Sequence, residues 1–251
     1  MEESTHMSTA HKATLSLAAN YRGLSAALAV NPGNLSGKDK DFELNLNAFA
    51  NRYGIDVVYQ AAKSLTGKSV FNGESFHLDK GMIDMKMLNV NGYYAFNYRR
   101  FSYPAAFNQS YIQKHSAGSW LVGFSFMGGR MKTTASKPEN TPLLRTYVGH
   151  FGVGGGYAYN LVLYQKWLLH LSFLPSIVVA NRNNVEIDGD KRYMKTSFPD
   201  MIFVERAAVV RDFGSCFVGC TFSMSNSLLY NNLIDIDYRK WRLRLCMGFR
   251  I

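Results

Sequence analysis

The stretch DYRKWRLRLCMGFRI, residues 237–251, places large apolar side chains at every second position from its tryptophan onward. These positions are Trp241, Leu243, Leu245, Met247, Phe249 and Ile251, and the residues between them include Arg242, Arg244 and Arg250. Because successive side chains of a β-strand point to opposite faces, this pattern predicts a strand with one apolar and one basic face. A slip of one residue would exchange the two faces, so the register is strongly specified.

The same period of two recurs along most of the chain. It is clearest in residues 42–48, 55–61, 88–98, 120–126, 147–159, 167–179 and 216–224. Several of these runs reach about ten residues or more, whereas a globular strand usually has about five or six. A tilted strand that crosses a bilayer needs about nine to eleven. The opposite face carries glycine, serine, asparagine and arginine rather than a second apolar surface.

These patterns predict an all-β fold, a closed antiparallel up-and-down transmembrane β-barrel of about 10 strands, with a range of about 8–12. Backbone groups in lipid must be paired within the protein, so strands can cross a membrane only as a closed barrel. We expect residues 12–251 to form one barrel domain and residues 1–11 to be a disordered or tag-like N-terminus. Aromatic side chains near strand ends predict an interfacial girdle of Tyr98, Trp120, Tyr157, Tyr159, Trp167 and Trp241.

A soluble β-barrel that binds an apolar ligand is the alternative fold. In that case the apolar alternates would form the inner core, and Arg242 and Arg244 would lie in solvent. The direction in which the apolar alternates point therefore separates the two interpretations.

The charge of +10 comes from 28 basic and 18 acidic residues and could attract nucleic acid, anionic lipid or an acidic substrate. The basic residues are scattered through loops and strand alternates, and the chain has no basic helix and no Cys/His finger spacing, so we predict no nucleic-acid partner.

The sequence contains no run of about 18 apolar residues, so we predict no transmembrane helix. The N-terminal stretch MEESTHMSTAHK is polar and lacks the pattern of a signal peptide.

The cysteines give no sign of a disulfide or a metal site. Cys216 and Cys220 share strand parity at a separation of about 13 Å, too far for a local disulfide. We expect them to be small buried or lipid-facing groups, and the sequence predicts neither a metal nor a cofactor.

The inward arginines Arg242, Arg244 and Arg250 have two interpretations. They can form an ion-pair network with Glu43 and Asp56 that fills a narrow lumen, or they can make a pore that prefers anions. The network is favoured, because a barrel of about ten strands has a narrow interior that side chains largely fill.

His150, His170 and Ser172 are the weak catalytic candidates, since they share the inward parity on adjacent predicted strands. A histidine within hydrogen-bond reach of a serine could serve acyl transfer or lipid hydrolysis, with Asp56 or Glu43 to orient it. Serine and histidine in a polar lumen are more often hydrogen-bonded filler, so we predict no catalytic set.

The glycine-rich stretch GHFGVGGGYAYN, residues 149–160, lacks the Lys-Ser/Thr ending of a phosphate loop. Its inward glycines, Gly152, Gly154 and Gly156, instead leave room for bulky neighbours or permit sharp curvature. The polar segment 101–120 is expected to be an ordered loop, with a plug inside the lumen as the alternative.

The segment FSYPAAFNQSYIQKHSAGSWLVG, residues 101–123, with MLNVNGYYAFNYRR before it and the terminal WRLRLCMGFRI, resembles the domain-of-unknown-function 4421 family. The likeness covers about Ser16 to Ile251. It implies an outer-membrane-type β-barrel of Gram-negative bacteria whose activity is unassigned. Membrane lipid and another outer-membrane protein are then the expected partners, and the leader peptide is expected to be removed or to lie outside this sequence.

The function expected from these observations is a structural, binding or assembly role without enzymatic activity. An outer-membrane barrel enzyme that acts on lipid, as an acyl hydrolase or transferase, is the alternative within the same fold.

Overall fold

A computed structural model describes residues 4–9, 15–21, 24–30, 41–63, 65–71, 74–134, 144–187, 189–193, 200–229 and 236–249. Nearly all of the described chain is β-strand. The strands are β1 (Ser4–Thr9), β2 (Leu15–Tyr21), β3 (Leu24–Val30), β4 (Phe42–Phe49), β5 (Tyr53–Ala62), β6 (Leu65–Phe71), β7 (Glu74–Leu78), β8 (Ile83–Ala95), β9 (Ala117–Thr133), β10 (Leu144–Leu163), β11 (Trp167–Asn181), β12 (Asn184–Ile187), β13 (Asp190–Tyr193), β14 (Met201–Asp212), β15 (Cys216–Leu229) and β16 (Ile236–Phe249). One short helix, α1 (Pro104–Phe107), follows β8.

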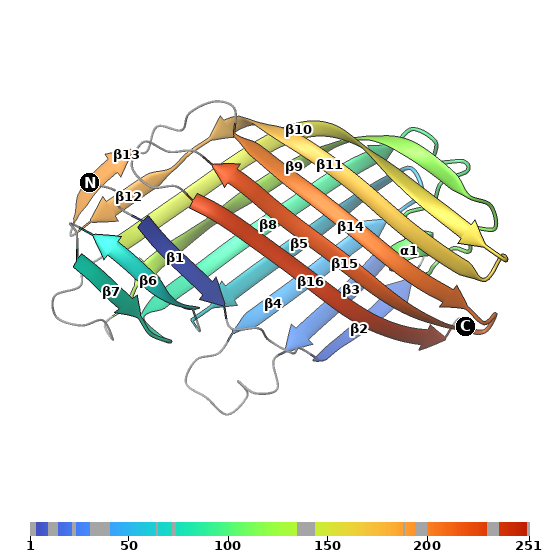
Figure 1. Ribbon diagram of the computed structural model, residues 1–251, viewed down its shortest axis with the longest axis horizontal. Coiled ribbons are helices and arrows are strands. Elements are labelled where there is room, and N and C mark those ends of the chain that lie inside the picture. The colour runs from blue at the N-terminus through green and yellow to red at the C-terminus, as the bar shows by residue number, and fades with distance from the viewer. Residues whose placement is uncertain are drawn as a thin grey trace.

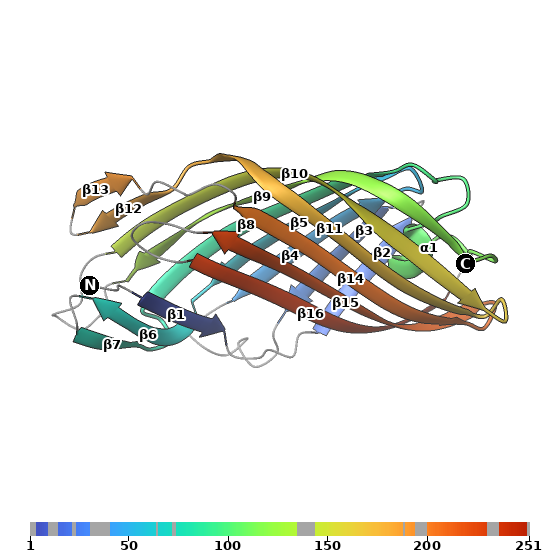
Figure 2. The same ribbon diagram turned by 45° about the horizontal axis from the view of Figure 1, so that its top comes forward.

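The main sheet has thirteen antiparallel strands and curls into an open half-barrel (Figures 1 and 2). Its order is β16-β15-β14-β11-β10-β9-β8-β5-β4-β3-β2, and β12 and β13 form a hairpin that extends from β10. Chain neighbours are sheet neighbours almost throughout, which confirms the prediction of an all-β, antiparallel, up-and-down fold. The N-terminal segment contributes β1, which joins β6 and β7 in a separate three-stranded sheet.

The faces of the long strands follow the predicted alternation. Along β11 exposed and buried residues alternate, with Leu171 69% exposed between the buried His170 and Ser172. On β16 the apolar side is outermost, and Leu245 is 85% exposed while its neighbours Arg244 and Cys246 are half-buried. The large apolar alternates therefore point outward and the polar ones toward the inside of the curl.

The inner face is more apolar than the sequence predicts. Strand β14 buries Ile202, Val204, Ala208 and Val210 on its inner side, with apolar residues on its outer side as well. A strand that is apolar on both faces shows no alternation of apolar and polar residues. For this reason the alternation does not predict a strand at residues 201–212.

The two ends of the sheet differ in their connections. At one end, here called the turn end, three-residue connections join β4 to β5, β10 to β11 and β14 to β15, and the longer segment 96–116 joins β8 to β9. At the other end the connections carry the β6–β7 and β12–β13 hairpins. The sequence alone does not separate long from short connections in this way.

Glycines allow β10 and β11 to approach closely. A Cβ atom on Gly154 would meet the carbonyl oxygen of Pro175, and one on Gly156 would meet that of Phe173. Room for bulky side chains and sharp curvature were the two roles expected for these glycines. The atoms that a Cβ would meet belong to the backbone of β11, which favours a role in the close approach of curved strands over room for bulky side chains.

Candidate functional site

The segment that follows β8 folds into the inside of the sheet at the turn end. Its residues 101–106 are all buried, and α1 packs against β11 and β14. We call residues 101–109 the inserted segment. Of the two expectations for this part of the chain, the plug inside the curl describes it better than an ordinary surface loop.

Aromatic stacking holds the inserted segment. The Tyr103 ring lies 4.3 Å from that of Tyr93 on β8 and 4.9 Å from the His170 imidazole on β11. The guanidinium of Arg206 on β14 lies 6.0 Å from the Tyr103 ring and 5.9 Å from that of Phe107. Burial raises the pKa of the Tyr103 phenol, and the nearby Arg206 guanidinium offsets part of this rise.

A buried hydrogen-bond chain runs from the wall to the inserted segment. His170 Nε2 lies 3.0 Å from Ser172 Oγ, and His170 Nδ1 lies 2.6 Å from Asn160 Oδ1 on β10, the residue opposite His170 in the strand register. The Asn160 amide nitrogen donates to the Ser102 carbonyl at 2.9 Å and to Gln113 Oε1 at 2.7 Å. Since an amide oxygen only accepts, Nδ1 of His170 carries the proton and Nε2 is free to accept from the Ser172 hydroxyl.

This chain has the order of a nucleophile, a base and an orienting group. Ser172 and His170 were candidates from the sequence, and Asn160 takes the orienting position that Asp56 or Glu43 was expected to fill. All three side chains are 3% exposed or less, so the inserted segment covers the serine. Sequence reasoning missed Asn160 because it considered only acidic groups, although its inward parity on β10 was visible.

His150 does not join this chain. It is buried farther along β10, with Nε2 3.0 Å from the amide nitrogen of Asn183. Ten residues separate it from Asn160, which is about 33 Å along a strand.

The inward charges form two groups of direct ion pairs on the inner side of the sheet. Glu43 on β4 is hydrogen-bonded by Arg242 of β16 and lies 3.1 Å from Lys240 Nζ, which also donates to Gln60 at 2.8 Å. Asp56 on β5 pairs with Arg206 at 3.1 Å. These contacts join β16 and β14 to β4 and β5, which lie far apart in the sheet order.

Not every residue of the expected network takes part in direct pairs. Arg244 points inward without a direct ion pair in the described part of the chain, and Arg250 lies outside the described residues. Lys240 and Arg206 were missed. The parity of β16 could have found Lys240, whereas the apolar faces of β14 conceal Arg206.

Five of the six expected girdle residues lie at the turn end. Trp120, Tyr157, Tyr159 and Trp167 are exposed on the outer face there, and Trp120 and Tyr157 contact each other with ring centroids 5.2 Å apart. Tyr98 lies in the connection after β8. Trp241 is also exposed but lies eight residues before the end of β16, away from this group.

The three cysteines are free thiols. Within the described ranges no group of three or more His, Cys, Asp or Glu side chains could hold a metal ion. No described helix has the length and apolar character needed to span a membrane.

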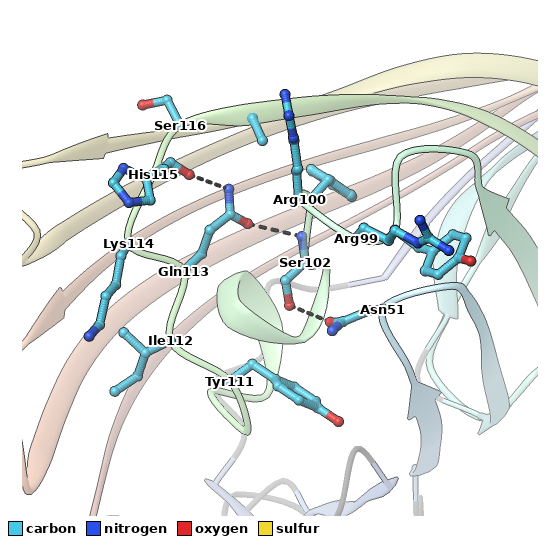
Figure 3. A pocket seen from close by; sticks show the side chains of 13 residues that line it. Asn51, Arg99, Arg100, Ser102, Tyr111, Ile112, Gln113, Lys114, His115 and Ser116 are labelled. Atoms are coloured by element: carbon cyan, nitrogen blue, oxygen red, sulfur yellow. Dashed lines mark hydrogen bonds between the residues drawn. The ribbon is translucent and has the colours of Figure 1, made fainter.

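A cavity of about 550 Å³ opens at the turn end beside the inserted segment (Figure 3). Its wall comes from residues 98–102, from residues 111–117 and from Asn51 in the β4–β5 turn. The Gln113 side chain connects the two segments of this wall. Its Oε1 accepts from the Ser102 backbone amide at 2.9 Å, and its Nε2 donates to the His115 carbonyl at 2.8 Å.

A family model described as "Domain of unknown function (DUF4421)" matches residues 2–250. The chain belongs to this DUF4421 family. The match confirms the resemblance found in the sequence, and the description assigns the family no activity. Comparison with curated proteins and with solved structures gives no match.

Proposed function

We propose that this DUF4421 protein spans the outer membrane of a Gram-negative bacterium as a closed β-barrel with a filled lumen, in a structural, binding or assembly role. The observation that carries the proposal is the apolar outer face of the long strands. Trp120, Leu171 and Leu245 are 68%, 69% and 85% exposed there. A soluble barrel would place such side chains inside, because each exposed Å² of apolar surface costs about 25 cal/mol in water.

The apolar face has the height of a bilayer core. Outward apolar residues on β11 run from Trp167 to Val179, about 40 Å along the strand at about 3.3 Å per residue. At a tilt of about 40° this corresponds to about 30 Å across a membrane. Glu205, half-exposed on the outer side of β14, is an exception in the middle of the strands. A carboxylate on the lipid face costs less than a basic group at the same depth.

The contents of the curl favour a barrel that does not conduct. The inserted segment lies inside the curl at the turn end, and the two ion-pair groups connect strands that are distant in the sheet. Transmembrane barrels have short turns on the periplasmic side and longer loops outside. By this rule the turn end faces the periplasm, and the β6–β7 and β12–β13 hairpins face outward.

The test is purification from membranes with and without detergent, followed by electrophoresis of heated and unheated samples. The proposal predicts that the protein sediments with the outer membrane, needs detergent and migrates differently after boiling. Recovery of a freely soluble monomer would reject it and favour the soluble barrel.

A lipid-acting barrel enzyme is the second candidate, because the Ser172–His170–Asn160 chain has the order required for acyl transfer. Attack by Ser172 on an ester requires the inserted segment to move, since it covers the hydroxyl. A fluorophosphonate probe would then label the protein in detergent, and Ser172→Ala or His170→Ala would abolish labelling. His150→Ala is the matched control and should leave labelling unchanged. Absence of labelling in the wild-type protein would exclude this candidate.

A further inference from the structure

The cavity at the turn end has a mixed lining, in which basic and uncharged polar side chains lie beside aromatic and aliphatic residues such as Phe101 and Ile112. Arg99, Arg100, Lys114 and His115 lie on its wall with Asn51 and Gln113, and none of the described lining residues is acidic. Its volume lies within the range of about 300–1,000 Å³ that is usual for small-molecule sites.

The Tyr98 ring contacts two guanidinium groups, that of Arg99 in the cavity lining and that of Arg52 beside it. The Arg52 guanidinium carbon lies 5.1 Å from the centre of the Tyr98 ring, and that of Arg99 lies 5.9 Å from the same centre. Arg52 is fixed further by the Tyr94 ring at 5.3 Å and by donation from its Nε to the Tyr94 hydroxyl at 3.2 Å. Stacking positions these cations and leaves other N–H groups of the guanidinium available.

Within the described ranges no carboxylate forms an ion pair with these cations. Among the described residues Arg52, Arg99, Arg100 and Lys114 take part in no ion pair, although the chain pairs its inward cations on β14 and β16 with Glu43 and Asp56. Like charges gathered at one opening raise the local concentration of anions.

The cavity wall is fixed before any ligand arrives. Gln113 Oε1 receives hydrogen bonds from Ser102 and Asn160, and the Ser102 hydroxyl donates to Asn51 at 2.6 Å. A wall that is already ordered reduces the entropy lost on binding.

We propose that this cavity binds an anion that carries phosphate or carboxylate groups on a small polar body, of the size of a sugar phosphate. Arginine forks bind both groups through paired N–H donors, which favours arginine over lysine at such a site. The proposal does not depend on the membrane assignment, because the cavity is formed within one chain.

The test is calorimetric titration of the purified protein with fructose 1,6-bisphosphate at low salt, with fructose as the uncharged control. We expect saturable binding of the bisphosphate alone, which weakens as salt is added. Arg99→Ala and Arg100→Ala should each weaken it about tenfold, since each removes a charge-assisted contact. Arg99→Lys keeps the charge and should lose less.

Lys166→Ala is the matched control, because it removes one positive charge at the same end outside this cavity. Its affinity should equal that of the wild type. Absence of saturable binding, or an equal loss in Lys166→Ala and Arg99→Ala, would overturn the proposal.

A competition arm identifies the source of the anion. Dioctanoyl phosphatidic acid that displaces the bisphosphate would assign the site to a lipid headgroup. Bisphosphate binding that phosphatidic acid leaves unchanged would assign it to a free anion. Both results support the anion site.

Discussion

The Asn160 side chain uses its oxygen and its nitrogen at once. The oxygen accepts from His170, and the nitrogen donates to Ser102 and Gln113, so one residue connects β10, β11 and the segment after β8. Removal of such a group leaves several buried partners unsatisfied, each at a cost of about 1–3 kcal/mol.

Asn160→Ala should loosen the segment between β8 and β9 and leave the sheet folded. The expected result is faster tryptic cleavage after Arg99, Arg100 or Lys114, measured by mass spectrometry of the fragments. Asn45→Ala is the control, because Asn45 is equally buried on β4 and its side chain donates to Glu43, with no contact to the segment after β8 among the described residues. Equal cleavage of the two variants would show that Asn160 does not hold the segment.

Gly155 and Gly156 are neighbours with opposite surroundings. A Cβ atom on Gly156 would strike the Phe173 carbonyl, whereas one on Gly155 would have Leu121 O at 3.5 Å as its nearest atom. Gly156→Ala should therefore lower the free energy of unfolding by about 1–3 kcal/mol, and Gly155→Ala should change it little. Urea unfolding followed by tryptophan fluorescence measures both, and equal stabilities would contradict the close approach of β10 and β11.

At the scale of the element, substitutions on the outer face of β16 can show whether lipid or water surrounds the sheet. Leu243 is near the middle of the strand and Phe249 at its turn end, and both are strongly exposed on the outer face. In a bilayer Leu243→Arg should cost about 2–4 kcal/mol and Phe249→Arg about 0–1 kcal/mol, because the penalty depends on depth. Unfolding titrations in lipid vesicles give the difference. Two near-neutral substitutions would mean that water surrounds this face.

Elements with two distinct faces could be predicted from the sequence, and elements without them could not. Strands β11 and β16 were predicted with correct faces, because Leu171 and Leu243 alternate with polar residues. Strand β14 escaped prediction since Val204 and Val209 make both of its faces apolar. Likewise the pairing of Asn160 with His170 depends on the register of two strands, which no local pattern specifies.

At the scale of the whole molecule, the two edges of the sheet decide whether a barrel forms. Eleven strands follow one another from β16 to β2, and each pair of neighbours is antiparallel. The first and last members of such a series run in the same direction. Direct closure of β16 against β2 would therefore create one parallel seam, whereas bacterial single-chain barrels usually have an even number of strands.

Cysteine crosslinking tests this seam in a chain whose three native cysteines are replaced by serine. We expect Leu243→Cys on β16 to form a disulfide with cysteines scanned at alternate positions of β2 (Leu15–Tyr21), because a closed wall brings the strands to about 4.8 Å. Phe222→Cys with Leu243→Cys is the positive control, since these residues face each other across β15 and β16. In a parallel seam, moving the β16 cysteine from residue 243 to residue 247 should shift the best-trapped β2 position toward Tyr21. A shift toward Leu15 would instead indicate an antiparallel pairing, and a scan without any crosslink would show that the half-barrel stays open.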